Sequence, residues 1–297
     1  MKTILVPVDL TAAAEHTLVY ANKLAVRLGA EIVLLYCHHD SDEPSPNFTD
    51  HQKRLQNLTE RLRYVQLTRQ DGRRIRYRYA VRNGCLHDHV QGVIDEYGAE
   101  LVVMNLEHTD CGEESVNGNH AARIVRLASC PVLVVPPGNQ PLPSRIVFLA
   151  DFAHLESRTL PRLGELVRGL RAQLQLVHFY RDLKLGELVG IKRGMLQIKQ
   201  VLAGVAIDSK LVLDDDPLEG IGEFCSNIQA QLLVFAPANA SLLSRFFDVS
   251  YTKTHAYHTR IPVLVIRPQQ QPDDAFCCQH CALQDTASET TPALASL

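Results

Sequence analysis

The residues best suited to chemistry lie near the C-terminus, where cysteines and a histidine gather. Cys278 and Cys281 have C-x-x-C spacing, and His280 lies between them. Thiolates and imidazole are ligands that zinc prefers, and a C-x-x-C pair also suits a redox switch. A closed zinc site needs four ligands, and no second C-x-x-C pair completes a set. We therefore favour an oxidisable acidic tail, and a metal or redox switch is the less favoured alternative.

The other histidines do not form a clear metal pair. His87 and His89 are two apart on a predicted helix, where side chains do not face one another. The chain also lacks a Gly-x-Ser-x-Gly elbow, a His-Glu-x-x-His motif, a Walker loop and paired carboxylates. We predict no catalytic residue, and so a protein that binds without turnover.

Composition excludes several kinds of partner. The chain has 30 basic and 33 acidic residues and no Trp, which argues against a nucleic-acid partner. No apolar run approaches the roughly 18 residues that cross a bilayer, so no membrane partner is expected. The eight cysteines have no framework spacing, which indicates reduced thiols and a cytoplasmic location.

An internal repeat places the elements that would position any site. Cys130-Pro-Val-Leu-Val-Val-Pro136 recurs as Ile261-Pro-Val-Leu-Val-Ile-Arg-Pro268, with the prolines Pro131 and Pro262 131 residues apart. Nearer the start of each copy the offset is 142, because Asp9 and Asp151 both follow an apolar run. Two copies of one unit are therefore predicted, the second 11 residues shorter in its middle.

Apolar runs and helical spacings alternate along both copies. The runs that predict strands are Thr3–Val8, Glu31–Cys37, Ile75–Val81, Leu101–Met104, Pro131–Val135, Arg145–Ala150, Leu174–Tyr180, Ser209–Leu213, Leu232–Phe235 and Pro262–Ile266. Strands that alternate with helices form parallel sheets covered on both faces. The fold class predicted is α/β, with two tandem Rossmann-like domains, each a five-stranded, mainly parallel sheet.

The same pattern sets the domain boundaries. We predict a first domain over residues 1–137, a Pro-rich linker over 138–144 and a second domain over 145–268. Residues 269–297 are polar and acidic, which predicts a disordered tail.

Each domain has one candidate ligand crevice, because ligands of open parallel sheets bind at the carboxyl ends of the strands. In the first domain this edge holds Asp9 and the loop 105–119; in the second it holds Asp151 and the loop 236–250. Each Asp is suited to accept a ligand hydrogen bond or to cap the following helix.

The chain resembles a tandem universal stress protein over nearly all of residues 1–268. The resemblance is carried by Ile4-Leu-Val-Pro-Val-Asp9, by the fourth-strand runs, by both Pro-Val-Leu-Val segments and by the segment from Ser250 to Pro262. It implies a five-stranded α/β fold that pairs through its last strand. In one branch of that family it also implies ATP, bound by Gly-x2-Gly-x9-Gly-Ser/Thr after the fourth strand.

That ATP pattern is degenerate here. Its four positions fall on Asn105, His108, Gly118 and Asn119 in the first copy and on Ala236, Asn239, Val249 and Ser250 in the second. Only Gly118 and the Ser250 hydroxyl match, and His108 puts bulk where a backbone should approach phosphate. The first loop holds four acids and no base, whereas the second carries Arg245. An adenine nucleotide therefore suits the second crevice better.

We predict a non-enzymatic, universal stress protein-like binding or adaptor protein. Its halves would form an intramolecular pseudo-dimer through antiparallel contact of Val132–Val135 with Val263–Ile266, which hides two sheet edges. The alternative is an adenine-nucleotide sensor or weak ATPase that uses Asp151, Asn239 and Ser250. A homodimer of the whole chain and an unidentified protein partner stay open. The candidate ligand residues are Asp9, Asn105, Gly118, Asn119, Asp151, Asn239 and Ser250.

Overall fold

The structure is a computed structural model in which strands and helices alternate along the chain. It describes residues 1–38, 48–67, 75–108, 120–153, 155, 160–182, 185–214, 216–237, 240–248, 256 and 259–266. The strands are β1 (Thr3–Pro7), β2 (Glu31–His38), β3 (Tyr77–Asn83), β4 (Leu101–Asn105), β5 (Val132–Val135), β6 (Arg145–Ala150), β7 (Gln173–Tyr180), β8 (Ile207–Leu213), β9 (Leu232–Ala236) and β10 (Val263–Val265). The helices are α1 (Ala12–Leu28), α2 (Phe48–Leu67), α3 (Leu86–Tyr97), α4 (His120–Leu127), α5 (Leu160–Leu170), α6 (Leu185–Val201), α7 (Pro217–Asn227) and α8 (Ala240–Phe246).

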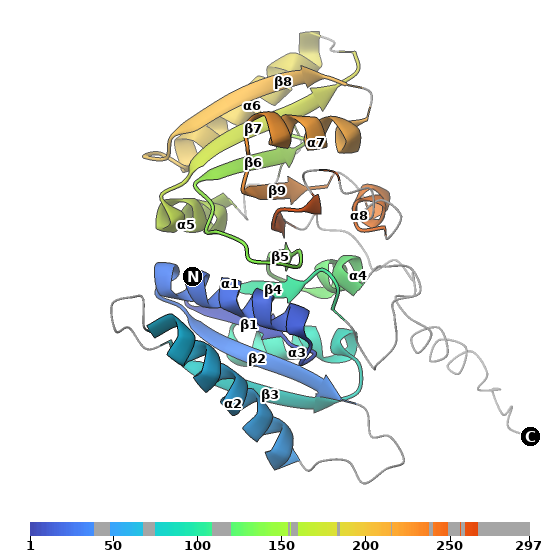
Figure 1. The fold of residues 1–297 in the computed structure, drawn as a ribbon. Helices are drawn as coiled ribbons and strands as arrows, with labels where there is room; N and C mark the ends of the chain where they lie inside the picture. Colours follow the sequence, from blue (N-terminus) through green and yellow to red (C-terminus); the bar gives the residue numbers. More distant parts are fainter. Residues whose placement is uncertain are drawn as a thin grey trace, which may run out of the picture.

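All ten strands form one sheet in the order β3-β2-β1-β4-β5-β10-β9-β6-β7-β8 (Figure 1). Neighbours are parallel except at β5 and β10, where Leu133 lies opposite Leu264 in an antiparallel pair. The order on one side of this joint mirrors the order on the other, so each half reads outward in the same sequence of elements. The predicted α/β class, with parallel strands and helices on both faces, is confirmed.

The helix ends follow local chemistry. The Thr11 hydroxyl accepts from the Ala14 N–H at 3.2 Å and begins α1, which Gly29 ends in the left-handed conformation at φ 69°. The Asp216 carboxylate caps α7 by accepting from the Leu218 N–H at 2.9 Å, and Pro217 occupies the first turn. These caps place the carboxyl ends of the strands beside helix starts, where a ligand crevice is expected.

Two hydrophobic cores lie on the two faces of the sheet, and both continue across the joint. Leu133 and Leu264 belong to one core, and Val134 and Val263 to the other. On the first face α1 and α5 approach so closely that a Cβ on Gly169 would lie 2.5 Å from Leu28. The halves therefore share both cores (Figure 1).

The two halves differ most between their second and third strands. There, 38 residues separate β2 from β3, but only 26 separate β7 from β8. This places the predicted shortening of the second copy within the region expected for it. None of the helices in the described ranges is long and apolar enough to cross a membrane.

Candidate functional site

The clearest polar site lies in the first half, at the carboxyl ends of β1 and β4. Asp9 follows β1, Asn105 ends β4, and the register of these strands places Asn105 beside Val8. His108 follows in the next turn, and its backbone N–H donates to the Asn105 carbonyl at 3.3 Å. His120 begins α4. Two neighbouring central strands and one helix start thus bring four polar side chains together.

Asp9 is held by the start of α1. Its Oδ1 accepts from the Thr11 N–H at 3.0 Å and from the Thr11 hydroxyl at 2.6 Å. Its Oδ2 lies 3.7 Å from His108 Nδ1, and the Asp9 side chain is only 4% exposed. Thr11, rather than Asp9, is the helix cap. The Asp9 carboxylate therefore braces the cap and faces an imidazole.

Asn105 is the most unusual residue of the site. Its side chain lies on the same strand face as Leu101 and Val103 and is fully buried. Within the part of the chain that the structure describes, neither its Oδ1 nor its Nδ2 has a hydrogen-bond partner. A buried amide without partners costs about 1–3 kcal/mol per group, and such groups are rare in folded proteins. The amide therefore marks a place where a bound molecule would find a donor and an acceptor.

Two histidines complete the site, and the sequence analysis missed their role. The rings of His108 and His120 meet edge to face with centroids 6.5 Å apart, and both residues are buried. His108 was interpreted only as bulk in place of a glycine, and His120 was not singled out. A histidine directly after a central strand and another at the next helix start were the available signal.

More imidazoles lie at the carboxyl end of β2. His38 stacks on His51 of α2 with centroids 4.6 Å apart, and Tyr36 lies 5.2 Å from His51. Burial raises the pKa of Tyr36, Arg54 opposes this, and the negative charge of Asp9 adds to the rise. The Tyr36 phenol therefore stays neutral and feels the Asp9 charge, so this aromatic group adjoins the polar site.

The second crevice, which the sequence favoured for a nucleotide, is filled by side chains. Asp151 Oδ1 accepts from the Ala153 N–H at 3.1 Å, so it braces a turn as Asp9 does. The next residue, Phe152, is fully buried and meets Phe148 edge to face at 5.5 Å. Gly194 of α6 packs on the Phe152 backbone, where a Cβ would lie 1.8 Å from the carbonyl oxygen.

The stretch that should have formed the second phosphate loop contains helix α8. Phe246 stacks on Phe235 of β9 with centroids 4.9 Å apart, and Phe247 is also buried. Arg245 was interpreted as a charge available to a nucleotide, but it pairs with the Asp216 carboxylate. Burial opposes ionisation of Asp216, yet Arg245 and the Leu218 N–H lower its pKa overall. The described residues leave this side of the crevice closed.

Several predicted site residues cannot be placed. Gly118, Asn119, Asn239, Ser250, Cys278, His280 and Cys281 lie outside the described residues. Of the seven candidate ligand residues, the structure therefore places three, and it brings two of these, Asp9 and Asn105, to neighbouring strand ends.

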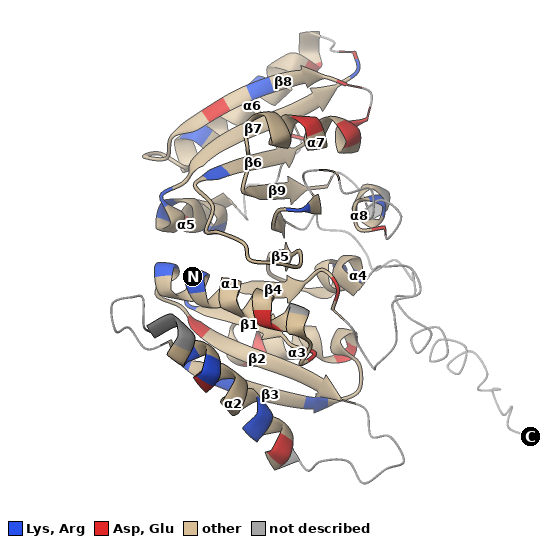
Figure 2. Ribbon diagram, viewed as in Figure 1, with Lys and Arg blue, Asp and Glu red and all other residues tan. Residues whose placement is uncertain are grey.

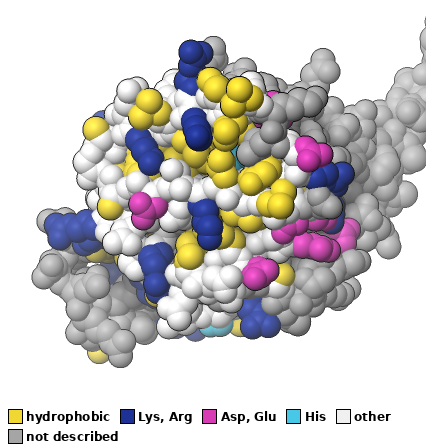
Figure 3. Space-filling view, turned by 90° about the horizontal axis from the view of Figure 1, so that it is seen from above, with side chains coloured by type: hydrophobic (Ala, Val, Ile, Leu, Met, Phe, Trp, Pro, Cys, Tyr) yellow, Lys and Arg dark blue, Asp and Glu magenta, His cyan; other side chains and the backbone are white. Residues whose placement is uncertain are grey.

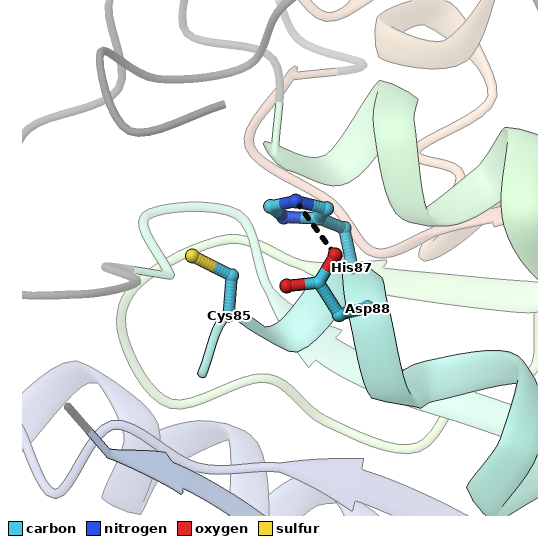
Figure 4. A group of neighbouring side chains, drawn as sticks. All are labelled: Cys85, His87 and Asp88. Atoms are coloured by element: carbon cyan, nitrogen blue, oxygen red, sulfur yellow. Dashed lines mark ion pairs between the residues drawn. The ribbon is translucent and has the colours of Figure 1, made fainter. Parts of the chain in front are cut away.

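One cluster of metal-binding side chains occurs among the described residues. Cys85, His87 and Asp88 at the start of α3 place ligand atoms within 4.8 Å of one another (Figure 4). His87 Nε2 lies 3.3 Å from Asp88 Oδ1. His89 points elsewhere and contacts the Asn83 carbonyl at 2.7 Å, so the predicted lack of a His87–His89 pair agrees with the geometry. Three donors suit zinc, but the positive end of α3 opposes a cation there.

Two buried cysteines are structural. Burial raises the pKa of Cys130 to about 11 and that of Cys225 to about 12. Both thiols stay protonated near neutral pH and are poor nucleophiles and metal ligands.

Comparison with known proteins gives the family of the first half. Residues 1–136 match the universal stress protein family. The resemblance predicted from the sequence is thus confirmed for the half that holds the polar site, and it stays a prediction for residues 145–268. No curated protein sequence matches the chain.

Solved structures support the same fold over both halves. A universal stress protein from Archaeoglobus fulgidus DSM 4304 has a TM-score of 0.58 at 12% identity, over 90% of this chain and 97% of its own. A functionally unknown protein from Pseudomonas aeruginosa PAO1 has a TM-score of 0.55 at 15% identity, over 97% and 98%. A universal stress protein in complex with cAMP reaches only 0.35 at 19% identity, over 46% of this chain and 98% of its own. At these identities the likeness shows the fold alone.

The triphosphate that the family resemblance implies does not fit the residues described here. A phosphate cradle needs exposed backbone N–H groups near glycines. Two of its positions are instead held by the buried side chains of Asn105 and His108, and the Asp9 carboxylate lies beside them. The first crevice suits a small polar ligand without a phosphate chain.

The buried amide of Asn105 leads to a stability prediction. Replacing it with the similarly sized Leu removes two buried polar atoms without partners, so Asn105→Leu should raise the free energy of unfolding by about 1–2 kcal/mol. Urea denaturation of ligand-free protein measures this. Asn22→Leu is the control, because Asn22 is equally buried but accepts from the Tyr77 hydroxyl at 2.8 Å, and it should destabilise. A loss of stability in Asn105→Leu would contradict the prediction.

Proposed function

We propose that this protein is a universal stress protein-like binding protein without enzymatic activity, which acts as an adaptor in a stress response and whose halves form an intramolecular pseudo-dimer. The observation that carries the proposal is the antiparallel pairing of β5 with β10. Each of these strands would otherwise be a sheet edge, and pairing satisfies the exposed backbone groups of both.

Contacts away from the two strands support one rigid scaffold. The Met1 amino group contacts the Glu165 carboxylate at 2.7 Å, and the Arg126 guanidinium donates to the Ser244 hydroxyl at 2.7 Å. Lys23 donates to the Gln140 carbonyl at 3.0 Å in the segment between the halves. These contacts support the proposed domains 1–137 and 145–268 with residues 138–144 as the linker. They argue for a scaffold that presents surfaces rather than for halves that move.

Sedimentation of the full chain tests this proposal. Because β5 and β10 already occupy one another, the chain should sediment as a monomer of about 33 kDa at micromolar concentration. It should also release no phosphate from ATP and Mg²⁺ above a buffer blank. A dimer that persists on dilution, or steady ATP turnover, would refute the proposal.

A second candidate function, small-ligand sensing, is favoured by the buried amide of Asn105 and is placed in the first crevice. It replaces the predicted adenine-nucleotide sensor at Asp151, because Phe152 and α8 fill that crevice. ATP with Mg²⁺ is expected to leave the melting temperature unchanged. Neutral compounds with a neighbouring donor and acceptor, screened at millimolar concentration, should raise it in the native chain and not in Asn105→Leu. Equal shifts in both proteins would remove Asn105 from the site.

A further inference from the structure

The outward face of α6 is apolar although it faces solvent. Leu185 is 79% exposed, and Val189 and Leu196 are each 57% exposed. At 100° per residue these three side chains fall within an arc of about 40° on the helix. The opposite side of α6 packs on the core through Ile191, Met195 and Ile198, so the exposed stripe is not part of the packing that holds α6 in place.

The fold does not require this stripe, as the first half demonstrates. Helix α2 occupies the same place there, between the second and third strands of its half. Its exposed positions are polar or charged, including Lys53, Arg54, Asn57 and Arg61, except for Tyr64 (Figure 2). Exposed apolar stripes of this kind mark interaction sites in soluble proteins.

Positive charge flanks the stripe. Lys192 and Arg193 lie on either side of it and are exposed, and neither forms an ion pair within the described ranges. Lys199 lies further along the Lys192 side and donates to the Ser209 hydroxyl at 3.2 Å. The one acid of the first turn, Glu187, projects away from the stripe. Apolar and basic side chains are interspersed at this end of the molecule (Figure 3).

We propose that the acidic C-terminal segment of this same chain, residues 269–297, docks on the α6 face formed by Leu185, Val189, Leu196, Lys192 and Arg193. The segment carries Asp273, Asp274, Asp285 and Glu289 and has no Lys or Arg. Between its acids lie Phe276 and Leu283, seven residues apart, which matches the apolar stripe in kind and the flanking cations in charge.

The segment is long enough to reach α6. The chain leaves β10 at the carboxyl edge of the sheet, the same edge at which α6 begins after β7. Four strand spacings separate β10 from β8, which is about 19 Å at 4.8 Å per strand. The 31 residues after Ile266 span up to about 100 Å when extended. A tether of this kind gives millimolar effective concentrations, so a weak contact is enough to populate the docked state.

Disulfide trapping in the full chain tests the docking, because the segment carries Cys277, Cys278 and Cys281. Leu185→Cys places a thiol on the stripe, and mild oxidation should join it to one of these cysteines within the same molecule. Tyr64→Cys on α2 is the matched control, since Tyr64 is 77% exposed and Leu185 is 79% exposed. Trapping of Leu185→Cys should be at least about tenfold faster, as expected for a tethered contact.

Charge reversal tests the electrostatic part. In the Leu185→Cys background, Lys192→Glu with Arg193→Glu should slow trapping by about fivefold, because like charges then face the acidic segment. Lys53→Glu with Arg54→Glu on α2 should leave the rate unchanged. Equal rates for the two cysteine variants, or trapping found only between two molecules, would overturn the proposal. In a second measurement on native cysteines, Asp273→Asn with Asp274→Asn and Asp285→Asn should speed hydrogen exchange in α6 and leave α2 unchanged; unchanged exchange in α6 would also overturn it.

Discussion

Replacing Gly194 with Ala should destabilise the protein by about 3 kcal/mol or more, which is at the upper end for overpacking a core. A Cβ at this position would lie 1.8 Å from the Phe152 carbonyl oxygen and 2.8 Å from its carbonyl carbon. Both are backbone atoms of the turn after β6, so no side-chain rotation relieves the overlap. Either α6 or this turn must shift, and both belong to the buried core. Guanidinium denaturation followed by circular dichroism measures the loss.

The same helix supplies the control. Gly186 lies in the first turn of α6, is exposed, and has nothing within 4 Å of the position of a Cβ. Gly186→Ala should therefore stabilise the protein by about 0.5–1 kcal/mol through the higher helix propensity of Ala. If Gly194→Ala instead left stability unchanged, α6 would not press on the Phe152 backbone. The second crevice would then have room for a ligand.

This close contact explains why the two halves carry different sites. Both crevices keep an Asp after the first strand, and each Asp accepts from a backbone N–H two residues on. After Asp151 comes Phe152, which turns inward under α6, whereas after Asp9 comes Leu10 at φ 59°. The inward aromatic ring fills the second crevice with carbon. The first keeps buried amide and imidazole groups, so the halves share a fold and differ in what they can bind.

The strands could be predicted from the sequence because their signal is local. Val132–Val135 and Val263–Val265 are short apolar runs after a proline, and their antiparallel contact follows from the need to cover two sheet edges. Boundaries shifted by two or three residues, as at β3, which begins at Tyr77 rather than Ile75. Strand ends depend on hydrogen bonding to neighbours, which apolar patterning does not report.

The site was harder to predict because it depends on contacts between distant residues. Arg245 was judged by its charge alone, but a carboxylate 29 positions away neutralises it. His108 was judged by its size alone, but it lies beside Asp9, 99 positions earlier in the chain. A family pattern identifies where a ligand would bind. Which ligand fits depends on the partners that the fold brings to each side chain.

Replacing Leu264 with Asp should have an effect at least as large, a loss of about 4 kcal/mol or more, because it buries an unpaired carboxylate. Leu264 is 1% exposed and lies directly opposite Leu133 in the antiparallel joint and beside Val234 of β9. The shape of the core suffers as well, since the removed side chain belongs to the core that both halves share. Urea unfolding monitored by circular dichroism measures the loss, and sedimentation shows whether the variant associates.

Leu213→Asp is the matched control. It makes the same change at the end of the edge strand β8, where Leu213 is 68% exposed, and should alter stability by less than about 0.5 kcal/mol. If the joint holds the halves together, Leu264→Asp should also expose β5 and β10 as free edges and promote dimers or aggregates, which Leu213→Asp should not do. A folded, monomeric Leu264→Asp variant with native stability would mean that the halves do not need this strand pair. The pseudo-dimer would then have to rest on contacts such as that between Met1 and Glu165, which is too exposed to hold two domains together.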